Sequence, residues 1–182
     1  MKKALKWILL VLAVVLMVAF AGFQFMKYNT KKASPEDRVL FTQGDLKLEV
    51  FYNRPTKKGR VIFGELVPYD QVWRTGANEA TTFTTSKPLT IDGKVLKAGA
   101  YTLWTIPGQD RWTVIWNDRM YPWGVDFDQQ AQRRPEHDAL QVQVPVERLT
   151  EPVEAFTIAV QEAPLALTLS WDDVRVTVPM AH

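Results

Sequence analysis

The sequence predicts an all-β domain, a β-sandwich of the jelly-roll type with about nine strands, preceded by one N-terminal transmembrane helix. Two observations lead to this fold class. After position 38, short segments in which apolar and polar residues alternate recur about every ten residues, separated by turn-forming residues. Before position 27, in contrast, the chain is almost entirely apolar. A domain built from such strands buries its apolar faces by packing one sheet on another, and a barrel is the alternative.

The N-terminal segment has the length and composition of a membrane span. Residues 7–26 read WILLVLAVVLMVAFAGFQFM, and Gln24 is their only strongly polar member. A helix of about 20 residues spans about 30 Å, the thickness of the hydrocarbon layer of a bilayer. We therefore interpret residues 1–26 as a transmembrane anchor that binds the membrane through residues 7–26. The alternative is a signal sequence with a cleavage site at residues 19–21, although the apolar run continues past that site.

The charges that flank this segment give little bias in orientation. Three lysines precede it and three follow it: Lys2, Lys3 and Lys6, then Lys27, Lys31 and Lys32. Because the N-terminal tail is short, we expect it to stay in the cytoplasm, so that the domain lies outside, in the periplasm or the extracellular space. Residues 27–37 are polar and contain Pro35, which predicts a linker before a domain of residues 38–182.

Composition excludes several classes of function. The chain has 22 basic and 20 acidic residues, but six of the lysines lie in the first 32 positions, which hold no acidic residue. The rest of the chain therefore carries 16 basic and 20 acidic residues, a net charge of −4, which argues against a nucleic-acid partner. The absence of cysteine excludes disulfides, thiolate metal sites and cysteine nucleophiles. Two histidines are too few for a multi-histidine metal site, so we expect no metal and no cofactor.

The first predicted strands differ in pattern. Residues 46–53, LKLEVFYN, alternate between an apolar and a more polar face, as expected for a strand with one buried side. Residues 60–67, RVIFGELV, are apolar on both faces and predict a central strand. Residues 81–91, TTFTTSKPLTI, are rich in β-branched side chains and are divided by Pro88.

The remaining strands follow from the same alternation. Residues 100–106 and 111–117 flank the turn-forming residues 107–110 and predict a hairpin. Residues 140–147 alternate but include Pro145, which cannot donate to a ladder, so we expect an edge strand there. Three further apolar segments complete the predicted set: FTIAV at 156–160, LALTLSW at 165–171 and VRVTV at 174–178.

Three segments also carry a family resemblance. They are RPTKKGRVIFGELVPYDQVWRTGANEAT at 54–81, DGKVLKAGAYTLWTIP at 92–107, and WTVIWN with the later WG between 112 and 124. With these strings the chain resembles the bacterial family named domain of unknown function 2911. The resemblance implies an exported bacterial protein, in agreement with the N-terminal segment, and it supplies no catalytic residues.

The segment from Trp73 to Thr81 is the main candidate for a ligand-binding site. Arg74 offers a planar fork of donors, Asn78 both donates and accepts, and Glu79 accepts. Together they could orient a carboxylate, a phosphate or a sugar hydroxyl in a hollow rimmed by Trp73, Trp104 or Trp123. The alternative is structural: Arg74 and Glu79 pair with each other across a tight turn at Gly76.

Four other segments give weaker indications. The basic residues between 54 and 60 are interpreted as a solvated hairpin tip, and Tyr121 and Trp123 as rings that either plug the core or stack on a sugar or a partner. Asp126 and Asp128 are too few for a calcium site. The segment around His137 predicts an exposed turn, and no serine lies in a nucleophile motif.

Three hypotheses of function follow. The first is a membrane-tethered, non-catalytic module outside the cytoplasm that binds a glycan, a small anion or an envelope protein. The second is a hydrolase or lyase that uses Glu79 as acid or base, with Arg74 and Asn78 as stabilising groups. The third is a structural envelope component without a ligand.

Overall fold

The computed structural model of the chain describes residues 2–126 and 128–182. It divides into two units: an N-terminal helix that ends at Ala33, and a β-domain of Ser34–His182. The prediction of an all-β domain preceded by one apolar helix is thereby confirmed.

The helical unit consists of α1 (Lys2–Ala33). Its residues from Ala4 to Ala33 are apolar and numerous enough to cross a membrane. Lys31 and Lys32 lie in the last turn, where positive charge complements the negative end of the helix dipole. Most of the segment 27–37, predicted to be a linker, therefore has regular structure, since the helix continues to Ala33 and the first strand begins at Glu36.

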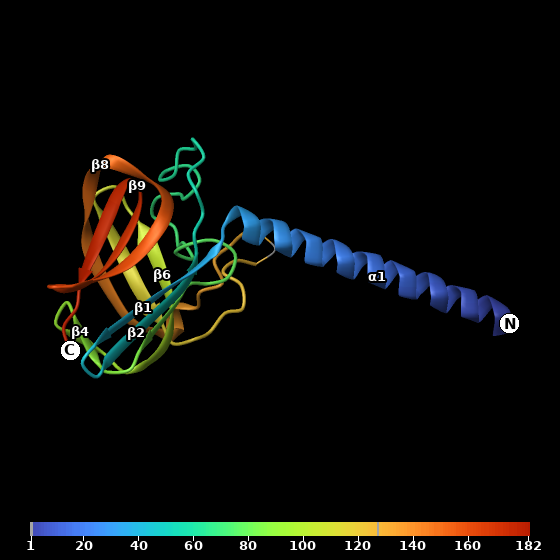
Figure 1. The fold of residues 1–182 in the computed structure, drawn as a ribbon, viewed down its shortest axis with the longest axis horizontal. Helices are drawn as coiled ribbons and strands as arrows, with labels where there is room; N and C mark the ends of the chain where they lie inside the picture. The colour runs from blue at the N-terminus through green and yellow to red at the C-terminus, as the bar shows by residue number, and fades with distance from the viewer. Residues whose placement is uncertain (1, 127) are drawn as a thin grey trace. The chain divides into compact units, whose positions relative to one another are not determined.

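The described residues of the β-domain form nine strands in two antiparallel sheets (Figure 1). The main sheet has the order β1-β2-β3-β6-β7-β8-β9 and the small sheet pairs β4 with β5. The bounds are β1 (Glu36–Gln43), β2 (Leu46–Asn53), β3 (Thr82–Thr85), β4 (Leu89–Ile91), β5 (Lys94–Leu96), β6 (Gly99–Pro107), β7 (Arg111–Asn117), β8 (Asp138–Glu162) and β9 (Leu165–Pro179), with the 3-10 turn η1 (Pro135–His137) before β8.

The main sheet curls until its two ends approach each other. The ladder between β8 and β9 has two irregularities, between Arg148 and Val153 and between Val153 and Thr157, and irregularities of this kind bend a strand. Beyond them, the far half of β8 reaches the segment that follows β2, where Phe156 donates its N–H to the carbonyl of Pro55 at 2.9 Å. The resulting shape is a sandwich close to a half-open barrel.

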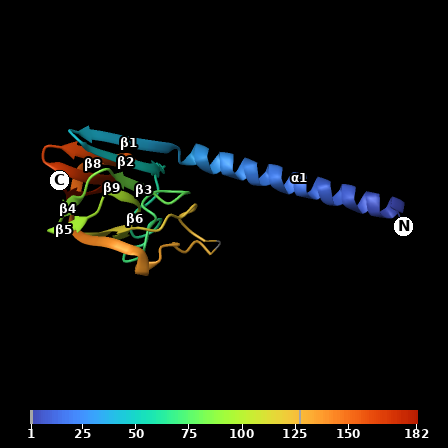
Figure 2. The same ribbon diagram turned by 90° about the horizontal axis from the view of Figure 1, so that it is seen from below.

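The small sheet lies beside β8 and the residues that follow β9. Thr90 of β4 exchanges two main-chain hydrogen bonds with Ala181, of 2.7 and 2.9 Å, so the C terminus lies beside β4 (Figures 1 and 2). Between Asp138 and Pro145, β8 pairs with β7 alone, and β9 joins it from Val146 onward. The stretch with Pro145 is thus an edge locally, although β8 as a whole lies inside the sheet.

The interior of the curl is filled by aliphatic and aromatic side chains from all seven strands. At its centre the rings of Trp73, Trp112, Trp171, Phe63 and Phe156 contact one another, for example Trp73 and Trp171 stacked at 5.9 Å. A second, smaller cluster on the opposite face of β6 and β7 is covered by loops.

Three details of the predicted strands were wrong. Residues 60–67 form no strand: they make a series of turns in which Ile62, Phe63 and Val67 are nevertheless buried. The C-terminal segments predicted as four strands join into two long ones, β8 and β9. The strands β1 and β5 were not predicted.

Candidate functional site

The loop that carries the predicted site residues is fixed to the sheet at its start. Trp73 exchanges two main-chain hydrogen bonds with Thr105 of β6, of 2.7 and 3.0 Å. Thr75 is fully buried, and its hydroxyl lies 3.1 Å from that of Thr105. The next residue, Gly76, has φ of +147°, and a Cβ there would lie 2.9 Å from the carbonyl oxygen of Asn53, so only glycine fits.

Asn53, at the end of β2, holds the second half of the loop. Its side chain is completely buried, donates to Oε2 of Glu79 at 3.0 Å, and accepts from Nδ2 of Asn78 at 3.4 Å. Asn78 has φ of +58°, a left-handed conformation that asparagine tolerates better than most residues. Asn53 was missed by the sequence reasoning. The available signal was an amide side chain at the end of a strand, directly after the inward-facing Tyr52.

Arg74 is the residue of this loop that the fold leaves unsatisfied. Its Nε is buried, and no group in the described part of the chain accepts a hydrogen bond from it. Among residues 2–126 and 128–182, no carboxylate lies within ion-pair distance of its guanidinium. Burial lowers the pKa of Arg74 from its ordinary value, because desolvation disfavours the charged form. The predicted alternative, an ion pair between Arg74 and Glu79, is therefore not what these residues form.

A second loop, after β7, covers Arg74. The chain passes Arg74 so closely at Gly124 that a methyl group there would lie 2.7 Å from the Cβ of Arg74. The N–H of Gly124 also donates to the carbonyl of Asn78 at 3.0 Å. Arg74 and Asn78 thus meet at Gly124, while Asn78 and Glu79 meet at Asn53. We refer to these five residues as the Arg74 site.

The loop after β7 is itself held by a buried polar network. Asn117, fully buried, donates to the carbonyl of Arg134 and to Asp138, and accepts from the hydroxyl of Tyr121. Arg133 and Asp138 form an ion pair whose side chains are only 9% and 5% exposed. Gly124 is consequently presented to Arg74 by a loop with fixed ends.

The three tryptophans predicted at the rim of the site have different environments. Trp73 packs in the central aromatic cluster and donates its indole N–H to the carbonyl of Gly76 at 3.2 Å. Trp104 is completely buried on the other face of the sheet, where its ring meets that of Tyr121 edge-on at 5.4 Å. Trp123 is half-buried in the loop after β7.

The secondary candidates mainly make structural contacts. Lys57 pairs with Asp172, and Arg60 donates to two main-chain carbonyls of its own turn. Asp126 caps the turn that follows it by accepting from two main-chain N–H groups. His137 ends η1 and lies 3.0 Å from an oxygen of Asp118. Among the described residues, no group of three or more histidine, aspartate or glutamate side chains could hold a metal ion.

What the Arg74 site can do chemically follows from its donors. A guanidinium group without a counter-charge binds carboxylate or phosphate oxygens through charge-assisted hydrogen bonds. The neighbouring Asn78 and Glu79 are held in place by Asn53, so an amide and a carboxylate lie beside the guanidinium. The carboxylate of Glu79 can accept from a hydroxyl group of a ligand but does not bind an anion.

The chain was compared with known proteins and families. The sequence model of the family described as "Protein of unknown function (DUF2911)" matches residues 34–180, which is nearly all of the β-domain and most of the chain. The chain belongs to this family, as the strings around Arg74 and Trp104 predicted. No curated protein and no solved structure matches it.

Proposed function

We propose that this member of the DUF2911 family is a membrane-anchored, non-catalytic binding module. In this proposal α1 is the anchor, the β-domain lies outside the cytoplasm, and the Arg74 site binds the oxyanion of a small molecule, a carboxylate or a phosphate. The single observation that carries the proposal is the buried Nε of Arg74, which has no acceptor in the described part of the chain.

The energetics of burial explain why this observation points to a ligand. A buried donor without an acceptor costs about 1–3 kcal/mol, and a buried charge without a partner costs more. The neighbouring polar groups Asn53, Thr75 and Asn117 are all hydrogen-bonded. Thr56 Oγ1 and Trp116 Nε1 are also buried without a partner among the described residues, but Arg74 is the charged member of this set, and a charge gains most from an acceptor supplied by a ligand.

The short connection between α1 and β1 supports a location of the β-domain at the membrane surface. The sequence enters β1 at Glu36, close behind the end of α1 at Ala33. If α1 spans the bilayer, the β-domain is therefore confined to the membrane surface. A ligand captured there is either a solute near the membrane or part of a molecule of the envelope.

Thermal unfolding tests the proposal. The full chain in neutral detergent micelles is heated with sodium phosphate, citrate or acetate, at ionic strength matched with sodium chloride, and unfolding is followed by tryptophan fluorescence. A ligand at 100 times its Kd stabilises the folded state by about 2.7 kcal/mol. For a domain of this size, each kcal/mol of stabilisation raises the Tm by about 2–4 °C. We expect at least one of these oxyanions to raise the Tm.

Two variants make the measurement specific. R74Q should abolish the shift, whereas R38Q should keep it, because Arg38 is an exposed arginine paired with Glu49 on the surface of β1 and β2. Both variants experience the same general effect of the salts on stability. Equal shifts in R74Q and the unmodified chain, or no shift with any of the three anions, would refute the proposal.

A further inference from the structure

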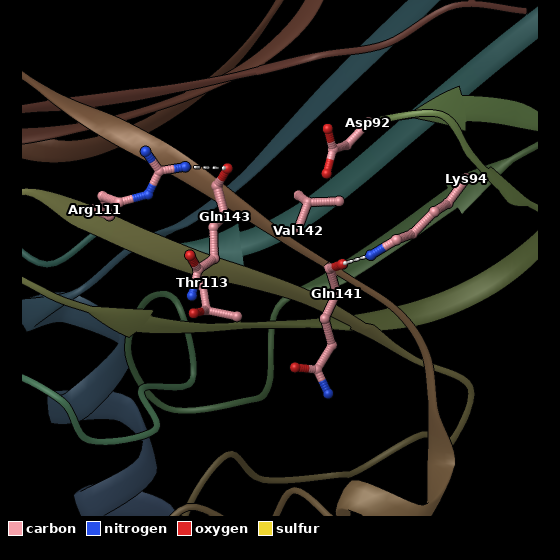
Figure 3. Close-up of a pocket in the computed structure, with 7 residues that line it drawn as sticks. All are labelled: Asp92, Lys94, Arg111, Thr113, Gln141, Val142 and Gln143. Atoms are coloured by element: carbon pink, nitrogen blue, oxygen red, sulfur yellow. Dashed lines mark hydrogen bonds between the residues drawn. The ribbon is translucent and has the colours of Figure 1, made fainter.

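A polar hollow lies on the β-domain, at the locally unpaired edge of β8. It has a volume of about 400 Å³ and is open to solvent. The side chains that shape it come from β5 and the turn before it, from β7 and from β8 (Figure 3): Asp92, Lys94, Arg111, Thr113, Gln141 and Gln143. We call it the β8 hollow; none of its residues belongs to the Arg74 site.

Two cations in this hollow are fixed on main-chain oxygens. Lys94 donates to the carbonyl of Gln141 at 3.1 Å, and Arg111 donates to the carbonyl of Gln143 at 3.3 Å. Figure 3 shows the two cationic groups pointing toward each other along β8 from opposite ends of the hollow. Carbonyls two residues apart on a strand lie about 7 Å apart, so a single carboxylate or phosphate between the cations can reach both, since each contact spans about 3 Å.

Neither cation has a carboxylate partner among the described residues. No ion pair joins Lys94 or Arg111 to any acidic side chain within the described ranges. Asp92, whose turn position has φ of +51°, holds its carboxylate above Val142, on the side of the hollow where Lys94 lies (Figure 3). The hollow thus carries two positive charges and one negative charge, a net charge of +1.

Uncharged groups complete the lining. The hydroxyl of Thr113 and the amide of Gln143 make no hydrogen bond to any other described residue, and both lie beside Arg111. Together with the carboxylate of Asp92, they offer donors and acceptors that suit hydroxyl groups. No aromatic side chain lines the hollow, so the flat faces of an uncharged sugar have no ring to stack on.

We propose that the β8 hollow binds an acidic sugar, with its carboxylate or phosphate between Lys94 and Arg111 and its hydroxyls on Asp92, Thr113 and Gln143. The two cations exchange their main-chain acceptors for the stronger, charge-assisted bonds to the oxyanion. The hydroxyl groups of the ligand use polar side chains that are otherwise hydrated.

Isothermal titration calorimetry tests this assignment. The full chain carrying R74Q is used in neutral detergent micelles at low ionic strength, so that the Arg74 site does not contribute. D-glucuronate and D-glucose 6-phosphate are titrated as the two forms of acidic sugar. D-glucose lacks the charge and cyclohexanecarboxylate lacks the hydroxyls. We expect at least one of the acidic sugars to bind, and D-glucose and cyclohexanecarboxylate to bind at least tenfold more weakly than it does.

Matched variants separate the hollow from general charge effects. K94Q/R111Q should weaken binding of the acidic sugar at least tenfold, whereas the exchange K94R/R111K, which preserves both charges, should keep most of it. K87Q/R148Q removes the same charges from exposed surface pairs and should leave the affinity unchanged; circular dichroism verifies that each variant is folded. Unchanged affinity in K94Q/R111Q, an equal loss in K87Q/R148Q, or equal binding of cyclohexanecarboxylate would overturn the proposal.

Discussion

Replacing Arg74 by methionine should make the protein more stable. In most buried positions the loss of an arginine is destabilising, because its hydrogen bonds and ion pairs are lost. Here no described residue accepts a hydrogen bond from the Nε, and methionine retains the apolar part of the side chain, which packs on Gly124. The substitution therefore removes a cost of the fold while it keeps the packing.

The size of the effect follows from the buried donor. A buried, unsatisfied donor costs about 1–3 kcal/mol, and we use the lower part of this range because Arg74 as a whole residue is only partly buried. We expect R74M to raise the free energy of unfolding by about 1–2 kcal/mol and the Tm by about 2–4 °C per kcal/mol. Such a gain is typical of positions where a functional residue is held at the expense of stability.

Urea denaturation of the full chain in neutral detergent micelles, followed by tryptophan fluorescence, measures the change. R38M is the control: Arg38 is 56% exposed in its pair with Glu49, so we expect a change within about 0.5 kcal/mol. A loss of 1 kcal/mol or more in R74M would refute the reasoning, because it would mean that the fold itself satisfies the guanidinium.

Three further outcomes are expected. Asp138→Ala should lower the free energy of unfolding by about 3–5 kcal/mol in the same assay, since Arg133 would be left buried without its counter-charge; a loss below 1 kcal/mol would contradict this. Burial raises the pKa of Tyr52 to about 12, so the stability that its neutral phenol contributes is present below pH 10 and is lost as the pH rises toward 12. Y52F should therefore show a shallower fall in unfolding free energy between pH 10 and 12, and parallel curves for the two proteins would disprove it. Deleting residues 2–33 should move the chain from the alkali-washed membrane fraction to the soluble fraction, and recovery of the full chain in the soluble fraction would argue against the anchor.

The strands were predictable where one face of the sheet meets the core and the other meets solvent. Residues 46–53 alternate for this reason and were found in place. The hairpin of β6 and β7, whose outer face is covered by loops, was also found in place, and its signal was the group of turn-forming residues at 107–110 between two apolar, β-branched segments. The strand predicted at residues 60–67 was wrong because alternation is absent there. An uninterrupted apolar run fits a central strand as well as a buried loop. What decides between them is Gly64, whose φ of +97° turns the chain under the ring of Tyr69, and no local pattern reveals that turn.

The candidate site could be located from the sequence but not assembled from it. The loop with Arg74 and Glu79 was identified, yet the groups that contact each of these two side chains come from residues far away in the chain. Glu79 accepts a hydrogen bond from Asn53, 26 residues earlier, and Arg74 is covered by Gly124 in a loop that follows β7. Trp104 was expected at the rim of the site, but its ring is buried against Tyr121 in the loop that covers the other face of the sheet. Such long-range coverage has no signature in neighbouring residues.

The closure of the curled sheet has a consequence for how the protein is made. Arg54 donates to the carbonyl of Phe156, 102 residues further along the chain, and contacts at such separation form late because a long loop must close first. A ribosome or an export channel delivers β1 and β2 well before the far half of β8. Until the segment with Trp171 has been synthesised, the apolar inner face of β1, β2, β3, β6 and β7 stays exposed to solvent. We expect this interval to be the period in which the chain depends most on chaperones.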